Sequence, residues 1–277
     1  MNKTGTADFF SPMPVVVAHR GDSRHYPENT LEAFASAVQM GVDVIETDVH
    51  LSRDGYLVIW HDPTLERNTN GSGRIEDHTL QELKELDAGY TFSPDGGKSF
   101  PFRGTGIRLA TLEEALTAFP HQRFNVDMKS RNPAIVDAFI DVIRRTHAEK
   151  RVIAASFAVQ TLRRIRRKAP DIQSSLAQAE VIRYLLRFRL GLLPRRLHPT
   201  LPTVFQVPTG AGPITLITPR FVKAMHQRGA IIQVWTINER EEMIRLLDMG
   251  VDSVMTDDPA LLQEVVQSRA TGLSTEP

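Results

Sequence analysis

The chain has 277 residues, of which 41% are hydrophobic and 24% charged, close to the averages of soluble globular proteins. Lys plus Arg and Asp plus Glu both number 33, so the formal net charge is zero, which argues against a nucleic-acid-binding protein that relies on a positive field. Cysteine is absent, which excludes disulfides and thiolate zinc sites.

Targeting and membrane signals are missing from the sequence. No stretch approaches the roughly 20 apolar residues that a membrane-spanning helix needs, and residues 1–14 hold no apolar run of signal-peptide length. The sequence therefore favours a cytoplasmic protein and leaves a peripheral membrane contact open. Nothing in the sequence indicates an oligomeric state.

Short apolar segments typical of strands alternate with amphipathic segments typical of helices. Several strand candidates are apolar at every position, as expected for a sheet that is buried on both faces. The strand candidates are 15–20, 42–51, 56–61, 123–129, 152–157, 172–177, 203–207, 231–237 and 253–256, and the main helix candidates are 29–40, 112–119, 133–147, 159–168, 219–228 and 240–249. Roughly eight such units predict an α/β fold, a parallel (β/α)8 TIM-type barrel.

The predicted barrel accounts for nearly the whole chain. A barrel of about 250 residues is commonly one domain, so we expect a single catalytic domain over residues 1–277 with its core at about 15–268. Residues 62–110 contain Gly, Asn, Pro and one short helix at 79–86, and they predict an insertion over the barrel mouth. Residues 178–202, rich in Arg and Leu, are interpreted as a second irregular stretch.

The second and third strand candidates are too close together for a parallel crossover. They are separated by Ser52 to Gly55, and Asp-Gly between apolar strands is a strong hairpin signal. A two-residue turn would pair Arg53 with Tyr56 and place His61 directly opposite Asp48. We therefore expect one antiparallel ribbon on an otherwise parallel barrel.

Acidic side chains share one face of this ribbon. Glu46, Asp48 and His50 lie on the same side because side chains alternate along a strand, and His61 would stand beside them. Buried carboxylates must be paired or coordinated, and two of them pointing into a barrel mouth suit a hard divalent cation. The alternative is an exposed polar face on an edge ribbon.

Polar residues also end the first strand candidate. His19, Arg20 and Gly21 follow Val15 to Ala18, and in β/α barrels the residues at the carboxyl ends of strands build the active site. Arg20 could clamp a phosphate, and Gly21 would allow a close backbone approach. Asn29 is interpreted mainly as a helix cap, with a hydrogen bond into the site as the alternative. A purely structural role for His19 is also open.

Taken together, these motifs closely resemble the glycerophosphodiester phosphodiesterase family. The resemblance spans residues 15 to about 259, and its first block is highly specific. The matching segments, in chain order, are His19-Arg20-Gly21, Pro27-Glu28-Asn29-Thr30, Ala33-Phe34, Gly41-Val42-Asp43, Ile45-Glu46-Thr47-Asp48-Val49, Asp54-Gly55, His61-Asp62, Asp127-Met128-Lys129, Ser156-Phe157, Val234-Trp235-Thr236-Ile237-Asn238, Gly250-Val251-Asp252 and Thr256-Asp257.

The resemblance implies a phospholipase C-like phosphodiesterase barrel and metal-dependent hydrolysis of small-molecule glycerophosphodiesters to glycerol 3-phosphate and an alcohol. It implies a divalent cation, Mg²⁺ or Ca²⁺, as cofactor. The residues it assigns are His19 and His61 as the general acid–base pair, Glu46, Asp48 and Asp127 as metal ligands, Arg20 and Lys129 as phosphate ligands, and Trp235 as a wall of the substrate pocket.

One ligand departs from the family pattern. The third metal carboxylate of the family is usually a Glu, whereas this sequence has Asp127. A side chain one methylene shorter must either lie nearer the cation or reach it through water. The substitution puts metal preference and affinity in question, and not the existence of the site.

Several functional questions stay open at the level of sequence. The nucleophile is either water or the neighbouring glycerol hydroxyl, which would give a cyclic phosphate; the resemblance favours the cyclic route. The order in which the two histidines act is also open. Rival functions are lysophospholipase D-type activity on lysophospholipids, a phosphoinositide phospholipase C-like enzyme, and a catalytically silent phosphate-binding barrel.

Residues 183–196 combine large apolar side chains with five arginines. One interpretation is a barrel helix whose apolar side packs inward and whose arginines are solvated. The other is an interfacial element that makes a peripheral membrane or lysolipid contact, since basic and apolar residues together are typical of surface membrane binding.

Overall fold

The computed structural model describes residues 9–198, 203–211 and 214–271. Parallel strands curl into a barrel in the order β5-β4-β2-β1-β10-β9-β6. Their bounds are β1 (Val15–His19), β2 (Val44–Leu51), β4 (Arg123–Met128), β5 (Val152–Ala155), β6 (Thr203–Val207), β9 (Ala230–Val234) and β10 (Ser253–Thr256). Single parallel bridges join Ser174 to Ala154 of β5 and Ser175 to Val204 of β6, so the segment 174–175 fills the position between the two sheet edges. The predicted TIM-type barrel is confirmed.

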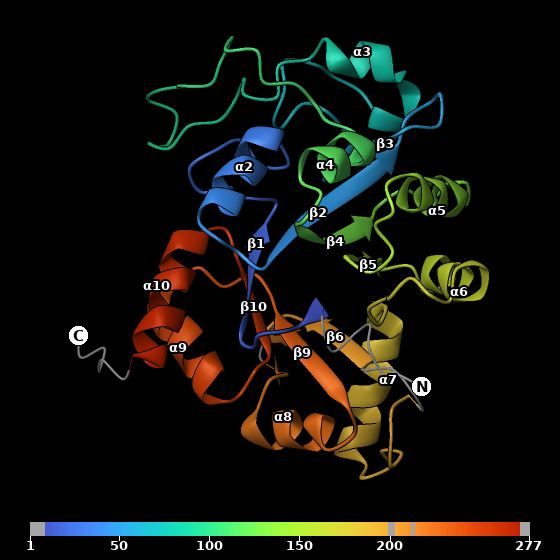
Figure 1. The fold of residues 1–277 in the computed structure, drawn as a ribbon, viewed down its shortest axis with the longest axis vertical. Coiled ribbons are helices and arrows are strands. Elements are labelled where there is room, and N and C mark those ends of the chain that lie inside the picture. Colours follow the sequence, from blue (N-terminus) through green and yellow to red (C-terminus); the bar gives the residue numbers. More distant parts are fainter. Residues whose placement is uncertain (1–8, 199–202, 212–213, 272–277) are drawn as a thin grey trace.

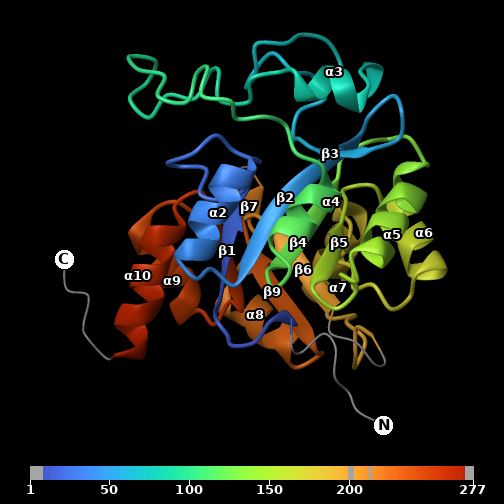
Figure 2. The ribbon, with the colours of Figure 1, turned by 45° about the horizontal axis from the view of Figure 1, so that its top comes forward.

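Helices cover the outside of the barrel (Figures 1 and 2). They are α2 (Leu31–Gln39), α4 (Leu112–Ala118), α5 (Ile135–Arg145), α6 (Val159–Lys168), α7 (Gln178–Arg189), α8 (Pro219–His226), α9 (Arg240–Asp248) and α10 (Pro259–Ala270). Threonine side chains cap α2, α4 and α8 by accepting a backbone N–H of the first turn. Helix α10 was not among the sequence candidates.

The apolar core has two layers because the strand side chains alternate between the inside and outside of the barrel. Inward residues such as Val17 and Val204 pack with Phe9 and Phe10 from the N-terminal segment. Outward residues pack against the helices in a larger cluster that includes Phe34, Phe124, Phe139, Phe205 and Phe221.

The insertion at 62–110 lies beyond the carboxyl end of β2 (Figure 2). It contains a short 3₁₀ turn, η1 (Ile75–Asp77), and helix α3 (Leu80–Lys84), which falls within the predicted 79–86. Thr79 and Glu82 form a capping box at the start of α3. The insertion has an apolar cluster of its own, in which Leu65, Ile75 and Leu83 are fully buried.

The predicted antiparallel ribbon is present, but its register differs by one residue. β3 (Leu57–Ile59) pairs with β2 so that Leu57 lies opposite Leu51 and Ile59 opposite Val49. The loop therefore has three residues, with Gly55 in the left-handed region at φ 89°. The predicted pairing of His61 with Asp48 is wrong, because the backbone N–H of Trp60 bonds to the carbonyl of Asp48.

The prediction that 178–202 is irregular is also wrong for its first part. Residues 178–189 form α7, residues 190–198 have no regular structure, and 199–202 lie outside the described residues. A small ribbon, β7 (Gly210–Ala211) and β8 (Ile214–Thr215), follows β6. In the ranges that the structure describes, no helix is both long and apolar enough to cross a membrane.

Candidate active site

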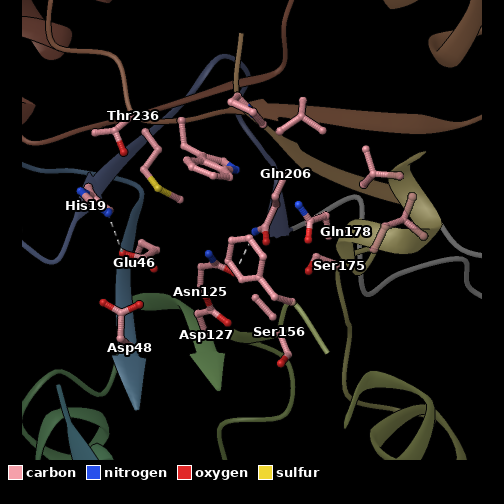
Figure 3. A pocket seen from close by; sticks show the side chains of 18 of the residues that line it. His19, Glu46, Asp48, Asn125, Asp127, Ser156, Ser175, Gln178, Gln206 and Thr236 are labelled. Carbon is pink, nitrogen blue, oxygen red and sulfur yellow. Dashed lines mark hydrogen bonds and ion pairs between the residues drawn. The ribbon is translucent and has the colours of Figure 1, made fainter. Parts of the chain in front are cut away.

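A cavity of about 370 Å³ opens at the carboxyl ends of the strands. It brings together all but one of the site residues expected from the sequence, and Figure 3 shows several of them pointing into it. Those that line it are His19, Arg20, Glu46, Asp48, His61, Asp127, Lys129 and Trp235. Asn29 is not among the lining residues.

The turn after β1 is held in an unusual backbone conformation. Arg20 and Asn29 both have left-handed φ angles, 58° and 60°, and the backbone N–H of Asn29 donates to the carbonyl of Arg20. Such conformations in non-glycine residues cluster at functional sites. Gly21 is required here, since a Cβ at this position would lie 2.8 Å from the backbone of Ala33 in α2.

Asn29 does not cap α2, contrary to the main sequence interpretation. Thr30 is the cap and accepts the N–H of Ala33 at 3.2 Å. The amide of Asn29 donates to Oδ2 of Asp48 at 3.0 Å, and its oxygen accepts from Thr47 at 2.8 Å. The alternative that the sequence left open, a hydrogen bond into the site, is the one observed. Asn29 therefore fixes the orientation of Asp48.

Neighbouring strands place the carboxylates side by side. Asp48 of β2 and Asp127 of β4 are paired in register, and Lys129 bridges them, with Nζ 3.0 Å from Oδ1 of Asp48 and 2.7 Å from Oδ2 of Asp127. Burial would raise the pKa of Asp48, but Lys129 and Arg20 hold it below its usual range. Burial and the charge of Asp48 raise the pKa of Glu46 to about 8. Burial, with a further contribution from Asp48, also raises the pKa of Asp127.

These carboxylates fit a divalent cation in chemistry, although they are not gathered around one point. In the part of the chain that the structure describes, no three His, Asp or Glu side chains are placed closely enough to hold a metal. The Lys129 ammonium lies between two of the candidate ligands. However, Oδ1 of Asp127 is buried without a hydrogen-bond partner. The raised pKa values of Glu46 and Asp127 show that burial disfavours the charged carboxylates, and a cation would relieve that cost.

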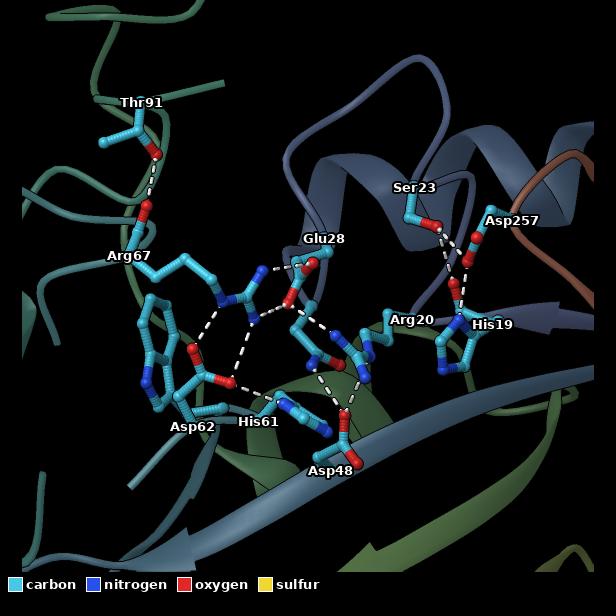
Figure 4. A network of polar contacts seen from close by, with 12 residues as sticks. His19, Arg20, Ser23, Glu28, Asp48, His61, Asp62, Arg67, Thr91 and Asp257 are labelled. Atoms are coloured by element: carbon cyan, nitrogen blue, oxygen red, sulfur yellow. Dashed lines mark hydrogen bonds and ion pairs between the residues drawn. The ribbon is translucent and has the colours of Figure 1, made fainter. Parts of the chain in front are cut away.

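His19 is held by the carboxylate of Asp257, which binds the ring nitrogen that is not on the cavity side (Figure 4). Its Nδ1 lies 2.6 Å from Oδ1 of Asp257, and its Nε2 lies 3.9 Å from Glu46 on the cavity side. The other oxygen of Asp257 accepts from Asn238 at 2.7 Å, and the hydroxyl of Ser23 also donates to Asp257. Burial opposes the charged imidazole, but Asp257 and Glu46 outweigh it and raise the pKa of His19.

No role was predicted for Asp257 from the sequence, although its position in the chain indicated a place in the active site. Asp257 is the first residue after β10, and in a β/α barrel residues at such positions face the active site.

His61 also has a carboxylate partner, Asp62, and Asp62 is itself paired with the side chain of Arg67. Nδ1 of His61 lies 2.6 Å from Oδ1 of Asp62, which forms an ion pair with Arg67. Arg67 comes from the insertion and also binds Glu28 at 2.6 Å, and Glu28 accepts from Arg20 at 2.9 Å (Figure 4). This chain of contacts ties the insertion to the turn after β1. No sequence motif indicated Arg67 as part of it.

His50 shares the face of Glu46 and Asp48 but does not line the cavity. Its ring is buried, and its Nε2 lies 3.1 Å from the carbonyl oxygen of His61. Burial lowers the pKa of His50. The side chain therefore supports the backbone at His61.

The remaining wall of the cavity is apolar. The ring of Trp235 meets that of Phe157 edge to face at 6.3 Å, and Nζ of Lys129 lies 5.4 Å from the centre of the Phe157 ring. Aliphatic side chains continue this wall toward α7, namely Leu176, Val181, Ile182, Leu185, Val207 and Leu216. The cavity is thus charged at one end and apolar at the other.

Comparisons with known proteins agree with this geometry. The glycerophosphoryl diester phosphodiesterase family matches residues 19–261, most of the chain. This chain belongs to that family. A protein of Caldanaerobacter subterraneus named glycerophosphodiester phosphodiesterase is 36% identical over 258 residues, covering 91% of this chain and 98% of that protein. Lysophospholipase D GDPD1 of Rattus norvegicus is 26% identical, covering 91% and 86%.

Solved structures of the family share the fold. The glycerophosphoryl diester phosphodiesterase domain of a Mycobacterium tuberculosis protein superposes with a TM-score of 0.81 at 24% identity, covering 92% of this chain and 99% of that domain. An Oleispira antarctica phosphodiesterase, in complex with the product sn-glycerol-3-phosphate, superposes with a TM-score of 0.75 at 26% identity, covering 94% and 99%. The family member described here is therefore an enzyme of the phosphoric diester hydrolase class.

Proposed function

We propose that the enzyme hydrolyses glycerophosphodiesters to glycerol 3-phosphate and an alcohol by two-histidine acid–base catalysis with a divalent cation. The observation that carries the proposal is the convergence of His19, His61, Arg20 and Lys129 on one cavity that also holds three carboxylates. The 36% identical relative is named for this activity, and the Oleispira enzyme was solved with sn-glycerol-3-phosphate bound.

Glu46, Asp48 and Asp127 are the proposed ligands of the cation, Mg²⁺ or Ca²⁺. Support comes from the unpartnered Oδ1 of Asp127 and from the burial of all three carboxylates in the lining of one cavity. When bound, the cation would stabilise the negative charge that develops on the phosphoryl oxygens. Lys129 would then turn from the carboxylates toward the substrate phosphate and, with Arg20, donate to its non-bridging oxygens.

His19 and His61 are the proposed proton carriers. One imidazole removes the proton from the glycerol hydroxyl next to the ester, which attacks phosphorus and forms a cyclic phosphate. The other gives its proton to the oxygen of the departing alcohol, and the roles reverse when water opens the ring. Asp257 and Asp62 occupy the Nδ1 side of the two rings, which leaves Nε2 of each for the substrate. A transient cyclic phosphate in ³¹P NMR spectra would support this route, and direct water attack would show none.

A second candidate activity is lysophospholipase D-type hydrolysis of lysophospholipids. The apolar wall between Phe157 and α7 favours it, because that wall could accept the acyl chain of a lysolipid whose phosphate occupies the charged end. Two mammalian relatives carry this name. The two activities share one site and one chemistry and differ in what fills the apolar end.

A panel of substrates tests the proposal. Purified protein would be assayed with glycerophosphocholine, glycerophosphoethanolamine and lysophosphatidylcholine, in Mg²⁺, Ca²⁺ or chelator, while release of glycerol 3-phosphate or of lysophosphatidic acid is measured. We expect metal-dependent release from at least the water-soluble diesters. Failure to cleave any diester in either metal would refute the function. A rate in chelator equal to that in metal would refute the cation.

A further inference from the structure

Helix α7 exposes aliphatic side chains on its outer surface. Ile182, Leu186 and Leu190 are 50%, 55% and 69% exposed, and Leu192 just after the helix is 66% exposed. The first three are spaced four residues apart and so form a stripe along one side. Of the eight large hydrophobic residues that are exposed in the described ranges, half lie within these eleven positions, so the exposure is concentrated here.

This stripe is separate from the side of α7 that packs on the barrel. Val181 and Tyr184 are buried, and Tyr184 meets Phe205 of β6 at 5.7 Å between ring centres. Phe188 packs edge to face on Phe221 of α8 at 5.3 Å. The barrel therefore already has its apolar contact with α7, and the stripe is a second apolar face on the same helix. Figure 1 shows α7 on the outside of the molecule, near α6 and α8.

Positive charge accompanies the stripe, and the segment that carries it has no acidic residue. Residues 181–198 contain five arginines and no Asp or Glu, although the whole chain has a net charge of zero. All five are exposed, namely Arg183, Arg187, Arg189, Arg195 and Arg196. The acidic residue that directly precedes this segment in the sequence, Glu180, is bound by Arg166 at 2.8 Å. The charge of this region is therefore complementary to an anionic surface and opposes a second copy of the same region.

We propose that the exposed side chains of residues 182–196, which we call the α7 surface, bind an anionic phospholipid bilayer. Aliphatic side chains would enter the boundary between headgroups and acyl chains, and the arginines would contact lipid phosphates. Ile182 and Leu185 also line the active-site cavity, so the α7 surface is continuous with its apolar wall. The bound enzyme would thus hold the apolar end of its cavity at the lipid surface. Only this consequence for the cavity rests on the proposed function; the binding itself does not.

Cosedimentation with vesicles tests the proposal. Vesicles of phosphatidylcholine alone would be compared with vesicles of phosphatidylcholine and phosphatidylglycerol, at low and high salt. We expect binding to the anionic vesicles that weakens as salt screens the arginines. The variants Leu186→Ser and Leu190→Ser should each weaken binding about tenfold, and Arg187→Gln and Arg189→Gln about fivefold each.

Matched controls lie elsewhere on the surface. Met13 and Tyr56 are 55% and 49% exposed, so Met13→Ser and Tyr56→Ser remove comparable apolar surface outside α7. Arg163 and Arg167 are exposed on the neighbouring helix α6, so Arg163→Gln and Arg167→Gln remove comparable charge. These four variants should bind anionic vesicles as the unaltered protein does.

Three results would overturn the proposal. They are no binding to anionic vesicles, equal binding to both vesicle types, and unchanged binding by the α7 variants. Light scattering addresses a rival occupant, because a dimer that Leu186→Ser converts to a monomer would assign the stripe to a second copy. The arginine variants keep the test decisive if a serine variant does not fold. Hydrolysis of a water-soluble diester without vesicles, on the same preparations, tests the proposed function separately.

Discussion

Nδ1 of His19 and Oδ1 of Asp257 lie 2.6 Å apart, and this pair differs from the other histidine–aspartate pair in the site. Among the described residues, the carboxylate of Asp257 receives its other hydrogen bonds from the neutral side chains of Asn238 and Ser23. Asp62, beside His61, is bound instead to the cationic Arg67. Asp257 therefore acts on His19 with an uncompensated charge, and it fixes the ring with Nε2 toward the cavity.

The first prediction is that Asp257→Asn lowers kcat about tenfold or more and changes KM little. The substitution keeps the size of the side chain but removes the charge that orients His19, so part of the acid–base contribution is lost. Steady-state kinetics on a water-soluble diester would measure it. The pH profile of kcat should also shift, which loss of stability alone would not cause.

Asp258→Asn is the matched control for Asp257→Asn. Asp258 is the next residue, and its carboxylate caps α10 by accepting the N–H of Leu261 at 3.1 Å. Asn caps helices as well as Asp does, so this variant should keep its fold and near-normal activity. If both variants lost activity equally, Asp257 would have no specific action on His19.

The second prediction is that His19→Ala and His61→Ala each lower kcat by at least about a hundredfold, the low end of acid–base contributions. Both side chains lie in the cavity wall, so the melting temperature should change little. His25→Ala is a suitable control, because the side chain of His25 is 51% exposed and pairs with Asp22, outside the cavity lining. A variant of His19 or His61 that kept a near-normal rate with full metal would remove that histidine from the mechanism.

The third prediction concerns the cation. Chelator should abolish turnover, and Mg²⁺ or Ca²⁺ should restore it. Asp127→Glu lengthens one proposed ligand by a methylene and should change metal affinity or preference more than stability. Isothermal titration of the metal-stripped proteins measures this without relying on activity. Superimposable titration curves for the two proteins would exclude Asp127 as a ligand.

The sequence was sufficient to predict the barrel because its strands are short, apolar and separated by readable helices. It also identified eight of the residues that line the cavity, because they lie in motifs that resemble one family. The register of the ribbon was missed by one residue, since Asp54-Gly55 suits both a two-residue and a three-residue loop. The local sequence could not distinguish the two loop lengths, because the loop length follows from how β3 pairs with β2.

The sequence also could not predict contacts between residues that are far apart in the chain. The ion pair of Arg67 with Glu28 joins residues 39 positions apart, and that of His19 with Asp257 joins residues 238 apart. Helix α7 was missed because apolar residues lie on both its faces, which obscures the usual amphipathic pattern. One of these faces packs on the barrel, while the other is exposed.

The fourth prediction compares two positions on α7. Phe188→Ala should lower the free energy of unfolding by about 2 kcal/mol. Removal of a fully buried ring costs about 3–5 kcal/mol, and the expected loss is smaller because Phe188 is only partly buried where it packs on Phe221. Leu186→Ala, two residues away and 55% exposed, should change it by less than about 0.5 kcal/mol. Urea denaturation of the two variants measures the difference. Equal costs would mean that Leu186 is covered in solution.

The fifth prediction concerns stability and pH at the opposite end of the barrel. Nε2 of His226 in α8 lies 2.8 Å from Oδ2 of Asp252, which also accepts the N–H of Ile232 in β9 at 2.7 Å. The hydrogen bond to Asp252 raises the pKa of His226 above its ordinary value of 6.5. Because the folded protein binds this proton more tightly than the unfolded chain, the pair stabilises the fold fully below that ordinary value. The stabilisation is lost as the pH rises through the raised pKa.

Urea denaturation of the unaltered protein and of His226→Gln, from about pH 5 to about pH 8, tests this linkage. Comparing the two proteins at each pH cancels the titration of all other groups, including His19. The unaltered protein should be the more stable at low pH, and its advantage should shrink steadily as the pH increases. An advantage that stayed constant over this range would show that the proton on His226 does not contribute to stability, and that the contact with Asp252 acts as a neutral hydrogen bond.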